Sequence, residues 1–450
     1  MIWANFLHFY QPPTQKPFWV RKITHESYRK IVEGLLEHPQ ARLTLNVNAV
    51  LVELLDKYDG KDVIAGIKKL LARGQIELTG SAKFHPLLPK IPAREAKRQI
   101  ALNDATHRKY FGKHYHPRGF FPPEMAFSVD VAQLAKDAGF EWVIVDELSF
   151  PPKKMPVDYS KIYTVKGLDD FAIFFRERRM SYKILSGQLG TGNLLVQSLG
   201  DRLKRHEYLL TAMDGETFGH HRPGMEHLLF EIYQSQKLKT CIISDLKDHF
   251  EQREAISPLP STWALMEKDL EKRTPFARWL DRGNIIHTMQ WELANLAMDA
   301  VHRYGHNRGP VRAMLDRAIH SDQFWWASAK PWWSLEMIER GAKELRDVVL
   351  QTRGTPAKAK QRAHALYQKI LYTGFDWQRE GIVEALAKQE DEEIRQRTDE
   401  GMPKLPKHEV EKIIRNLSRE IRVVVRRQEF ERAAQLRDRV SELRRYIAGR

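Results

Sequence analysis

The sequence has almost no cysteine and no long hydrophobic run. Cys241 is the single cysteine among 450 residues, which excludes an internal disulfide framework and is typical of a reducing compartment. No segment approaches the ~18 consecutive apolar residues that a membrane-spanning helix needs. The N-terminus lacks the basic and apolar regions of a secretory signal. We therefore expect a cytoplasmic protein that does not enter a membrane.

Aromatic residues and positive charge, in contrast, are plentiful. The 11 Trp and 20 Phe residues and a hydrophobic content of 42% are ample for a large core. The net charge is +15, and residues 401–450 hold 14 Lys and Arg against 7 Asp and Glu. A basic segment can bind nucleic acid. Because an Arg-rich helix is more often a solvated face or a protein-binding surface, we do not expect nucleic acid as a partner.

Short apolar segments alternate with helical patterns through the first two thirds of the chain. The alternation predicts a mostly parallel sheet, and seven or eight such units favour closure into a barrel. We expect this barrel over residues 1–283, an α-helical region over 284–400, and a linker with a helical hairpin over 401–450. The expected strands are Ile2–Phe9, Arg42–Asn46, Gln75–Leu78, Gly119–Phe121, Trp142–Val145, Phe171–Phe175, Tyr208–Met213 and Thr240–Ile243.

The segment Leu209–His221, LLTAMDGETFGHH, places two carboxylates and two imidazoles after an apolar run. Residues i and i+2 of an extended chain point to the same side, so Asp214 and Glu216 can face one pocket. Burying such groups is costly unless they are paired or used. An acidic loop that caps a helix near Pro223 would explain the same residues without any chemistry.

Two earlier segments also place polar side chains at strand ends. His8 and Tyr10, in HFYQPP, lie on one side of the first strand, which Pro12 ends. Glu77 stands inside the apolar segment QIEL, where a buried carboxylate is rarely left unpaired, and His85 follows in a proline-stiffened loop. Parallel barrels carry their active sites at the carboxyl ends of the strands. These side chains are therefore candidates for one site.

The segment Gly119–Ser128, GFFPPEMAFS, holds Glu124 on a loop that two prolines fix and Phe121 and Phe127 shield. A carboxylate in a fixed position suits a nucleophile, which must lie within reach of one carbon. A charge that faces a helix N-terminus is the alternative interpretation. Together, Glu124 and Asp214 are the two carboxylates that glycoside hydrolysis needs.

Four ordered segments resemble the signature regions of glycoside hydrolase family 57: His8–Pro12, Gly74–Pro86, Phe121–Glu124 and Asp214–His220. The resemblance covers roughly residues 1–390 and includes Trp263, Trp279 and Asp316–Trp333. It implies an α/β fold, a (β/α)7 barrel (an incomplete TIM-like barrel) followed by an α-helical region. It also implies a retaining hydrolase or transglycosylase that acts on α-glucans, of α-amylase or 4-α-glucanotransferase type.

The resemblance assigns roles to individual residues. Glu124 matches the nucleophile and Asp214 the general acid/base. Trp326 lies in a Trp-rich segment and is a further candidate for stacking on a sugar ring. Packing of helices on the barrel would also explain this residue. The implied substrate-binding residues are His8, Gln11, Glu77, His85, Phe121, Glu216, His220, Trp263 and Trp326. No metal and no cofactor are expected.

Two positions depart from the family pattern. Tyr10 stands where the second His of H-x-H-Q-P is usual, and Phe121 stands where the family has Trp. Both would touch the sugar at the cleavage point, so they affect substrate identity more than chemistry. Burial and Glu216 should raise the pKa of Asp214 so that it can donate a proton, whereas hydrogen-bond donors near Glu124 should keep that group charged.

Two other classes of protein remain open. One is a metal-dependent, polysaccharide deacetylase-like barrel hydrolase. Its ligand pair normally follows H-x3–4-H, whereas the close pairs here are His220–His221 and His114 with His116. The other is a non-catalytic glycan-binding protein. Activity on a maltooligosaccharide, metal dependence, and binding without turnover distinguish the three classes.

Helical spacing dominates after residue 284. It predicts helices over Thr288–Tyr304, Val311–Ala327 and Ser334–Gln351. After a linker at Gly401–Pro406, two helices over 409–427 and 429–447 resemble the UVR motif, a short antiparallel hairpin that mediates protein contacts. So short a hairpin is marginal alone in water. We expect it to be dispensable for chemistry and covered by the enzyme's helical region or, preferably, by a second copy or partner protein bound through 407–450.

Overall fold

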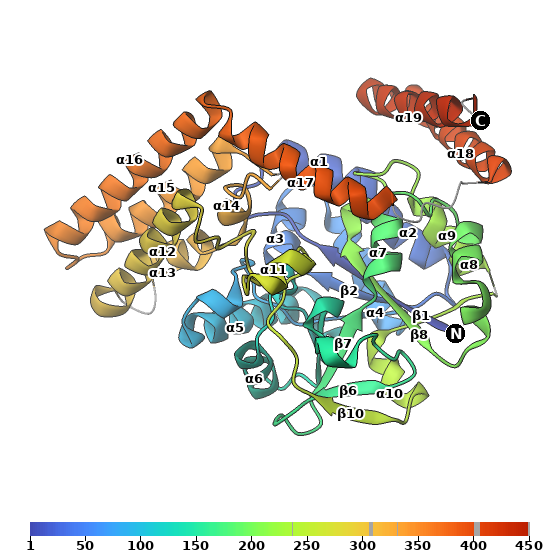
Figure 1. Cartoon of the computed structure of the whole chain (residues 1–450), viewed down its shortest axis with the longest axis horizontal. Helices are drawn as coiled ribbons and strands as arrows, with labels where there is room; N and C mark the ends of the chain where they lie inside the picture. Colours follow the sequence, from blue (N-terminus) through green and yellow to red (C-terminus); the bar gives the residue numbers. More distant parts are fainter. Residues whose placement is uncertain (236, 306–308, 331, 400–405, 449–450) are drawn as a thin grey trace.

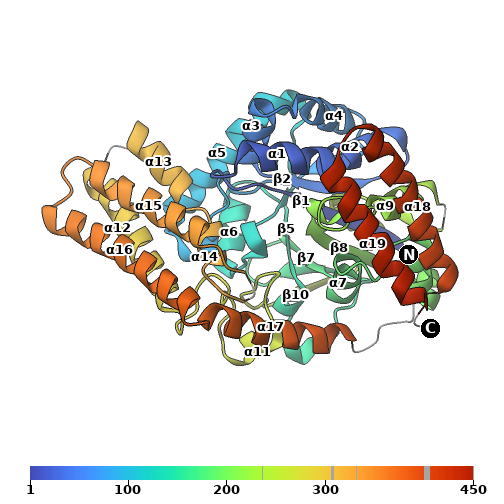
Figure 2. The ribbon, with the colours of Figure 1, turned by 90° about the horizontal axis from the view of Figure 1, so that it is seen from above.

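The computed structural model of the protein describes residues 1–235, 237–305, 309–330, 332–399 and 406–448, with side chains except those of 391–399. A curled sheet ringed by helices forms the largest part. A helical region and a helical hairpin lie at opposite ends of the long axis (Figures 1 and 2). Of the predicted linker Gly401–Pro406 only Pro406 is described, and Pro331 also lies outside the described residues. No helix in the described part is long and apolar enough to span a membrane.

The strands follow the predicted alternation closely. All eight predicted segments form strands, with ends shifted by at most two residues. Two further strands, β6 and β10, were not predicted. The strands are β1 (Ile2–Phe9), β2 (Leu43–Val47), β3 (Ile76–Leu78), β4 (Gly119–Phe120), β5 (Trp142–Asp146), β6 (Ile162–Val165), β7 (Ala172–Arg176), β8 (Tyr208–Asp214), β9 (Lys239–Cys241) and β10 (Arg253–Ile256).

Seven of these strands close into a barrel. β3, β2, β1 and β8 are parallel neighbours, as are β4, β5 and β7. Two narrow seams join the halves: the Gly80 amide donates to the Gly119 carbonyl at 2.8 Å, and the Glu177 amide donates to the Leu210 carbonyl at 2.8 Å. The circular order β1-β2-β3-β4-β5-β7-β8 confirms the predicted (β/α)7 barrel. β9 pairs with the start of β1, and β6 and β10 extend the sheet beyond β7.

Alternation along β1 and β8 sorts their side chains between two hydrophobic clusters. Ala4 and Phe6 face the cluster inside the barrel, whereas Trp3, Leu7 and Phe9 face the cluster beneath the surrounding helices. On β8, Leu210 and Ala212 likewise point inward and Leu209 and Met213 outward. The next inward positions are His8 and Asp214, at the carboxyl ends of the two strands.

Helices cover the outside of the barrel. The barrel helices are α1 (Pro17–Ile23), α2 (Arg29–Glu37), α3 (Ala49–Lys57), α4 (Lys61–Ala72), α5 (Ala93–Phe111), α6 (Val129–Asp137), α7 (Arg178–Leu185), α8 (Gly192–Leu199), α9 (Glu226–Gln234) and α10 (Leu246–His249). A π-helical turn, η1 (Thr24–Tyr28), joins α1 to α2. Helices α1, α7, α8, α9 and α10 were not predicted from the sequence.

The first long helix of the helical region begins at Ile285. The region contains α12 (Ile285–Tyr304), α13 (Pro310–Ala318), α14 (Asp322–Trp325), α15 (Leu335–Gln351), α16 (Ala357–Arg379) and α17 (Ile382–Asp399), preceded by the short α11 (Glu267–Glu271). The single helix predicted over Val311–Ala327 is wrong. The chain breaks between α13 and α14 because the Ser321 amide donates to the His85 carbonyl at 2.9 Å instead of continuing the helix.

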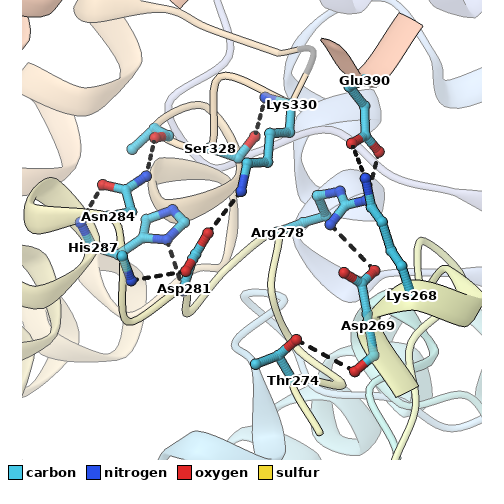
Figure 3. Close-up of polar contacts among 12 residues, drawn as sticks. Lys268, Asp269, Thr274, Arg278, Asp281, Asn284, His287, Ser328, Lys330 and Glu390 are labelled. Carbon is cyan, nitrogen blue, oxygen red and sulfur yellow. Dashed lines mark hydrogen bonds and ion pairs between the residues drawn. The ribbon is translucent and has the colours of Figure 1, made fainter. Parts of the chain in front are cut away.

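Buried charges fasten the helical region to the segment that leaves the barrel. Arg278 lies between Asp269 and Glu390 of α17 and donates to both, at 3.3 and 2.5 Å (Figure 3). Close by, Lys330 donates to Asp281 at 2.7 Å (Figure 3). These contacts hold α17 and the segment around α14 in fixed positions beside the barrel.

The C-terminal hairpin, α18 (Lys407–Arg426) and α19 (Phe430–Ala448), packs on the barrel of its own chain. Its two helices share a small core that includes Leu417 and Leu436. Barrel groups complete the cover: Leu417 lies against Gly224, and Ile413 against Gly190. The surface that covers these apolar residues of the hairpin is therefore the barrel of the same chain. It is neither the helical region nor a second copy. The homo-oligomer stays a prediction.

Candidate active site

The carboxyl ends of the barrel strands gather the predicted polar residues. His8 on β1 is in register with Asp214 on β8, so the two strands end side by side. His85 and Glu124 reach the same place from the loops after β3 and β4, where the His85 Nδ1 atom lies 3.6 Å from the Glu124 carboxylate. The structure thus brings both predicted catalytic carboxylates to one end of the barrel.

Glu124 is held in an unusual backbone conformation. Its φ of 62° is in the left-handed region that non-glycine residues rarely adopt. Pro122 and Pro123 lead into it, and the Trp263 amide donates to its carbonyl at 3.2 Å. The Trp263 indole also donates to the Glu124 carboxylate at 3.0 Å. Strained residues persist where their surroundings over-determine them, commonly at functional sites, and here the result is a fixed carboxylate.

The helical region supplies residues that the sequence analysis did not single out. Ser321, at the break between α13 and α14, donates to Glu124 at 3.1 Å. The Tyr10 hydroxyl donates to the Asp322 carboxylate at 2.5 Å, and the Tyr10 ring stacks on His85 with centroids 3.9 Å apart. His320 contacts the same Asp322 oxygen at 2.9 Å. The polar run HSD before FWW was the signal that could have found them.

Hydrogen-bonding groups continue inward from Glu124 in a single line. The Ser321 hydroxyl lies 3.0 Å from His85 Nδ1, the Nε2 atoms of His85 and His8 are 3.2 Å apart, and His8 Nδ1 lies 2.8 Å from Asn46. The Asn46 atom is the amide oxygen Oδ1, which can only accept, so His8 Nδ1 donates to it. With both rings neutral, His85 Nε2 donates to His8 Nε2, and His85 Nδ1 is left as an acceptor. The single proton of the Ser321 hydroxyl can therefore go either to His85 or to an ionised Glu124.

Burial dominates the pKa values of the two carboxylates. It raises the pKa of Glu124 to about 8, with the charges of Asp322 and Asp214 acting in the same direction and the bonds from Trp263 and Ser321 against it. Burial raises the pKa of Asp214 to about 6, opposed by the charge of Arg176. The expectation that donors would keep Glu124 charged is wrong, because burial and two neighbouring carboxylates outweigh those donors.

Gln11 and Glu216 form a second cluster with Tyr28 of η1. The Tyr28 hydroxyl and the Gln11 amide both donate to one oxygen of Glu216, the latter at 2.8 Å. The neighbouring Ser27 hydroxyl donates to the Gly215 carbonyl at 2.8 Å. These bonds tie the loop that follows Asp214 to η1, so Glu216 acts mainly as an anchor of that loop.

Four other predicted residues lie apart from Glu124 or beneath it. Glu77 lies deeper in the barrel and accepts from Thr44 at 2.7 Å. Phe121 is fully buried and packs under His8 with ring centroids 4.6 Å apart. Trp326 packs edge-on against Trp332 in the helical region, with centroids 6.0 Å apart. The fourth, His220, faces the C-terminal hairpin.

A buried charge network connects His220 to the hairpin. His220 Nδ1 lies 2.5 Å from Glu26 of η1, and Arg432 of α19 lies 3.8 Å from the same carboxylate. Arg432 is only 3% exposed and also donates to the Gly219 carbonyl. Gly219 has a φ of 109°, and an added Cβ would lie 2.0 Å from the Glu26 carbonyl, so glycine is required there. Burial acts to raise the pKa of Glu26, but His220, Arg432 and Lys22 together lower it.

We expect Arg432→Met to lower the free energy of unfolding by about 3–5 kcal/mol, because it leaves Glu26 buried without one of its partners. Arg437→Met is the matched control: the Arg437 side chain is 71% exposed and, among the described residues, forms an ion pair only with the adjacent Asp438, so its change should stay within about 0.5 kcal/mol. Denaturant titration of the whole chain measures both. Equal stability of the two variants would contradict the buried network.

The described residues contain no group of three or more His, Cys, Asp or Glu side chains arranged to hold a metal ion. The histidines nearest Glu124 are occupied with other contacts. Burial lowers the pKa of His85 to about 4 and also lowers that of His8, so both rings are neutral at pH 7. Both nitrogens of each ring lie within hydrogen-bond distance of other side chains.

Comparisons with known protein families and solved structures are consistent with the barrel and the site described above. Residues 8–258, more than half of the chain, match the model of glycosyl hydrolase family 57, and the chain belongs to this family. Residues 411–446 match the UvrB/uvrC motif, in accordance with the predicted UVR-like hairpin. The deacetylase alternative is thereby replaced by the family-57 assignment.

Characterised relatives are distant and longer. The α-amylase of Pyrococcus horikoshii is 25% identical over 285 residues, 60% of this chain and 44% of the relative. The 4-α-glucanotransferase of Thermococcus litoralis is 23% identical over 180 residues, 40% of this chain and 27% of the relative. The chain thus spans less than half the length of these relatives.

Solved structures share the fold. A family-57 branching enzyme from Thermococcus kodakaraensis superimposes with a TM-score of 0.62 at 15% identity, covering 83% of this chain and 96% of that one. The 4-α-glucanotransferase structure from Thermococcus litoralis gives a TM-score of 0.57 at 16% identity, covering 77% of this chain and 58% of that one. Both carry the barrel described above.

Proposed function

We propose that this chain is a retaining α-glucan hydrolase or glucanotransferase, with Glu124 as nucleophile and Asp214 as general acid/base. The observation that carries the proposal is the pair of largely buried carboxylates at one end of the barrel, near enough that the charge of Asp214 raises the pKa of Glu124. Family membership and the α-amylase and 4-α-glucanotransferase relatives support the substrate class. The single cysteine supports a cytoplasmic location.

In the first step, a carboxylate oxygen of Glu124 bonds to the anomeric carbon while the bond from that carbon to the glycosidic oxygen breaks. Asp214 gives its proton to the departing oxygen. The left-handed backbone of Glu124 and its bonds from Trp263 and Ser321 hold the attacking oxygen in place. Such positioning is a large part of the rate enhancement of covalent catalysis.

In the second step, the ionised Asp214 takes a proton from an acceptor hydroxyl as its oxygen attacks the anomeric carbon and releases Glu124. Water as acceptor gives hydrolysis, and a sugar hydroxyl gives transfer. Within this proposal, residues 1–283 supply both carboxylates, and residues 284–400 supply Ser321 and Asp322, which complete the site. Trp263 is in position to contact the sugar, whereas His8 and His85, which are 2% and 1% exposed, support the site from beneath.

The two raised pKa values predict a bell-shaped pH dependence of kcat/KM, with limbs near pH 6 and pH 8. Below about pH 6 both carboxyls hold protons and no nucleophile is left, whereas above about pH 8 both are ionised and no acid is left. The active form is the singly protonated pair with the proton on Asp214 and Glu124 ionised, so the two limbs belong to the pair and not to either residue. Initial rates from pH 4 to pH 10 test this. A single acidic limb near pH 4.5 and a flat profile above it would contradict it.

Incubation of the purified chain with maltoheptaose, followed by chromatography of the products, tests the proposal. Shorter products alone indicate hydrolysis, and longer and shorter products together indicate transfer. Retention is read from the anomer first released, before mutarotation. Absence of any product over a range of α-1,4-linked substrates would overturn the proposed function.

A further inference from the structure

A cavity of about 740 Å³ lies between α1 of the barrel and α19 of the hairpin, outside the group of residues around Glu124. Phe18 and Trp19 line its barrel side, and both are exposed, at 59% and 40%. Solvent-exposed aromatic pairs are unusual, since large apolar side chains are normally buried. The two rings meet edge to face with centroids 5.2 Å apart, which leaves a flat ring face free for a ligand.

The opposite wall belongs to the hairpin and is polar. The Gln435 amide has no hydrogen-bond partner among the residues that the structure describes, and it lines the cavity with charged residues of both signs. The charges balance only over the whole lining: Arg439, Arg445, Glu431, Asp438 and Glu442 lie on the hairpin, and Lys22 lies on α1. A lining without net charge selects for neither anions nor cations. It offers both donors and acceptors, as a neutral polyhydroxyl ligand requires.

The cavity lies beside the loop that begins at Asp214. His220, on that loop, lines the cavity, and its ring lies 6.4 Å from the Trp19 ring. The hairpin wall is fixed, because Arg432 joins it to Glu26 and to the Gly219 carbonyl, and Lys22 pairs with Glu431 at 3.7 Å. The site is therefore preformed rather than assembled by the ligand.

We propose that the α1–α19 cavity is a remote subsite that binds a distal part of an α-glucan chain, with Trp19 as the stacking platform and Gln435 as a polar contact. The aromatic face binds the apolar C–H face of a glucosyl ring, and the polar wall binds its hydroxyls. This inference rests on the proposed function and gives the hairpin a role in substrate binding. Long chains then gain contacts that short ones cannot reach.

The test compares kcat/KM for maltotriose and for maltoheptaose or longer chains. Trp19→Ala should lower kcat/KM at least tenfold more for the long substrate than for the short one, since losing one aromatic contact costs about one factor of ten. Gln435→Ala should act in the same direction with a smaller effect. Tyr372→Ala is the control, because Tyr372 is 68% exposed on α16, outside the cavity, and both substrates should be unaffected.

A second arm measures binding without turnover. Maltoheptaose is titrated calorimetrically into Glu124→Gln with and without Trp19→Ala, and the double variant should bind about tenfold more weakly. Equal losses on both substrates, or no loss of binding, overturn the subsite while the wild-type chain remains active. A wild-type chain that acts on neither substrate overturns the proposed function instead, and this inference with it.

Discussion

Replacing Glu124 by Gln should lower kcat by a factor on the order of 10⁴ or more, with little effect on folding. The variant removes the nucleophile, and covalent catalysis contributes a factor of this size or larger. The new amide fits the site: its oxygen can accept from the Trp263 indole, and its NH2 group can donate to the Ser321 hydroxyl. Progress curves with maltoheptaose and a thermal unfolding scan measure the two effects.

Two further variants test the assignment of Glu124 as the nucleophile more strictly. Glu77→Gln removes another buried carboxylate, one that is bonded to Thr44 and Ser244 deeper in the barrel, and should keep activity within tenfold of wild type in the folded protein. Glu124→Ala with azide should form a glycosyl azide of inverted configuration, as azide takes the vacated place at the anomeric carbon. Wild-type-like turnover by Glu124→Gln would end the nucleophile assignment.

Replacing Asp214 by Asn should cost a factor of about 10²–10⁴ in kcat on maltooligosaccharides, the usual contribution of a general acid. The loss depends on the leaving group. A nitrophenolate leaves without protonation. For a 4-nitrophenyl α-maltooligoside, the factor by which Asp214→Asn lowers the rate of bond breaking should therefore be at least 10² smaller than for a maltooligosaccharide. Burst kinetics on the aryl substrate separate that step from the second one.

Glu216→Gln is the matched control for Asp214. It lies two residues further along the same loop, and Tyr28 and Gln11 already bond to its carboxylate. We expect this variant to lower kcat on both substrates by similar factors, since it disturbs the position of the loop and not a proton transfer. If Asp214→Asn also affects both substrates equally, Asp214 is not the acid.

The strands were predictable because buried parallel strands are continuous apolar runs. β10 was missed for the opposite reason: Arg253–Ile256 is mostly exposed and has no such run. β6 pairs antiparallel with β7, outside the strand–helix alternation. Glu124 and Asp214 could be found because each follows a strand within a distinctive segment. The distance between the two carboxylates and their pKa values depend on burial in the tertiary structure, which a local sequence pattern does not contain.

Ser321 and Asp322 could not be predicted as site residues from periodicity, because helical spacing continues through Val311–Ala327. The helix breaks only when His85, more than 200 residues earlier, accepts from the Ser321 amide. The surface on which the hairpin packs could not be predicted for a related reason. Arg432 stands among other arginines such as Arg437, and only the fold distinguishes the buried one from the exposed one.

The pairing of Arg432 with Glu26 also sets the order in which the molecule can mature during synthesis. Glu26 leaves the ribosome some 400 residues before the arginine that helps to neutralise it, and domains generally fold as units from the N-terminus. Until α19 is made, a barrel that has already closed contains an acidic group in η1 lacking one of its buried cations. The Gly219–His220 end of the loop after Asp214 should therefore be one of the last parts of the nascent chain to take its final position, whereas Gly215 and Glu216 are already held by η1.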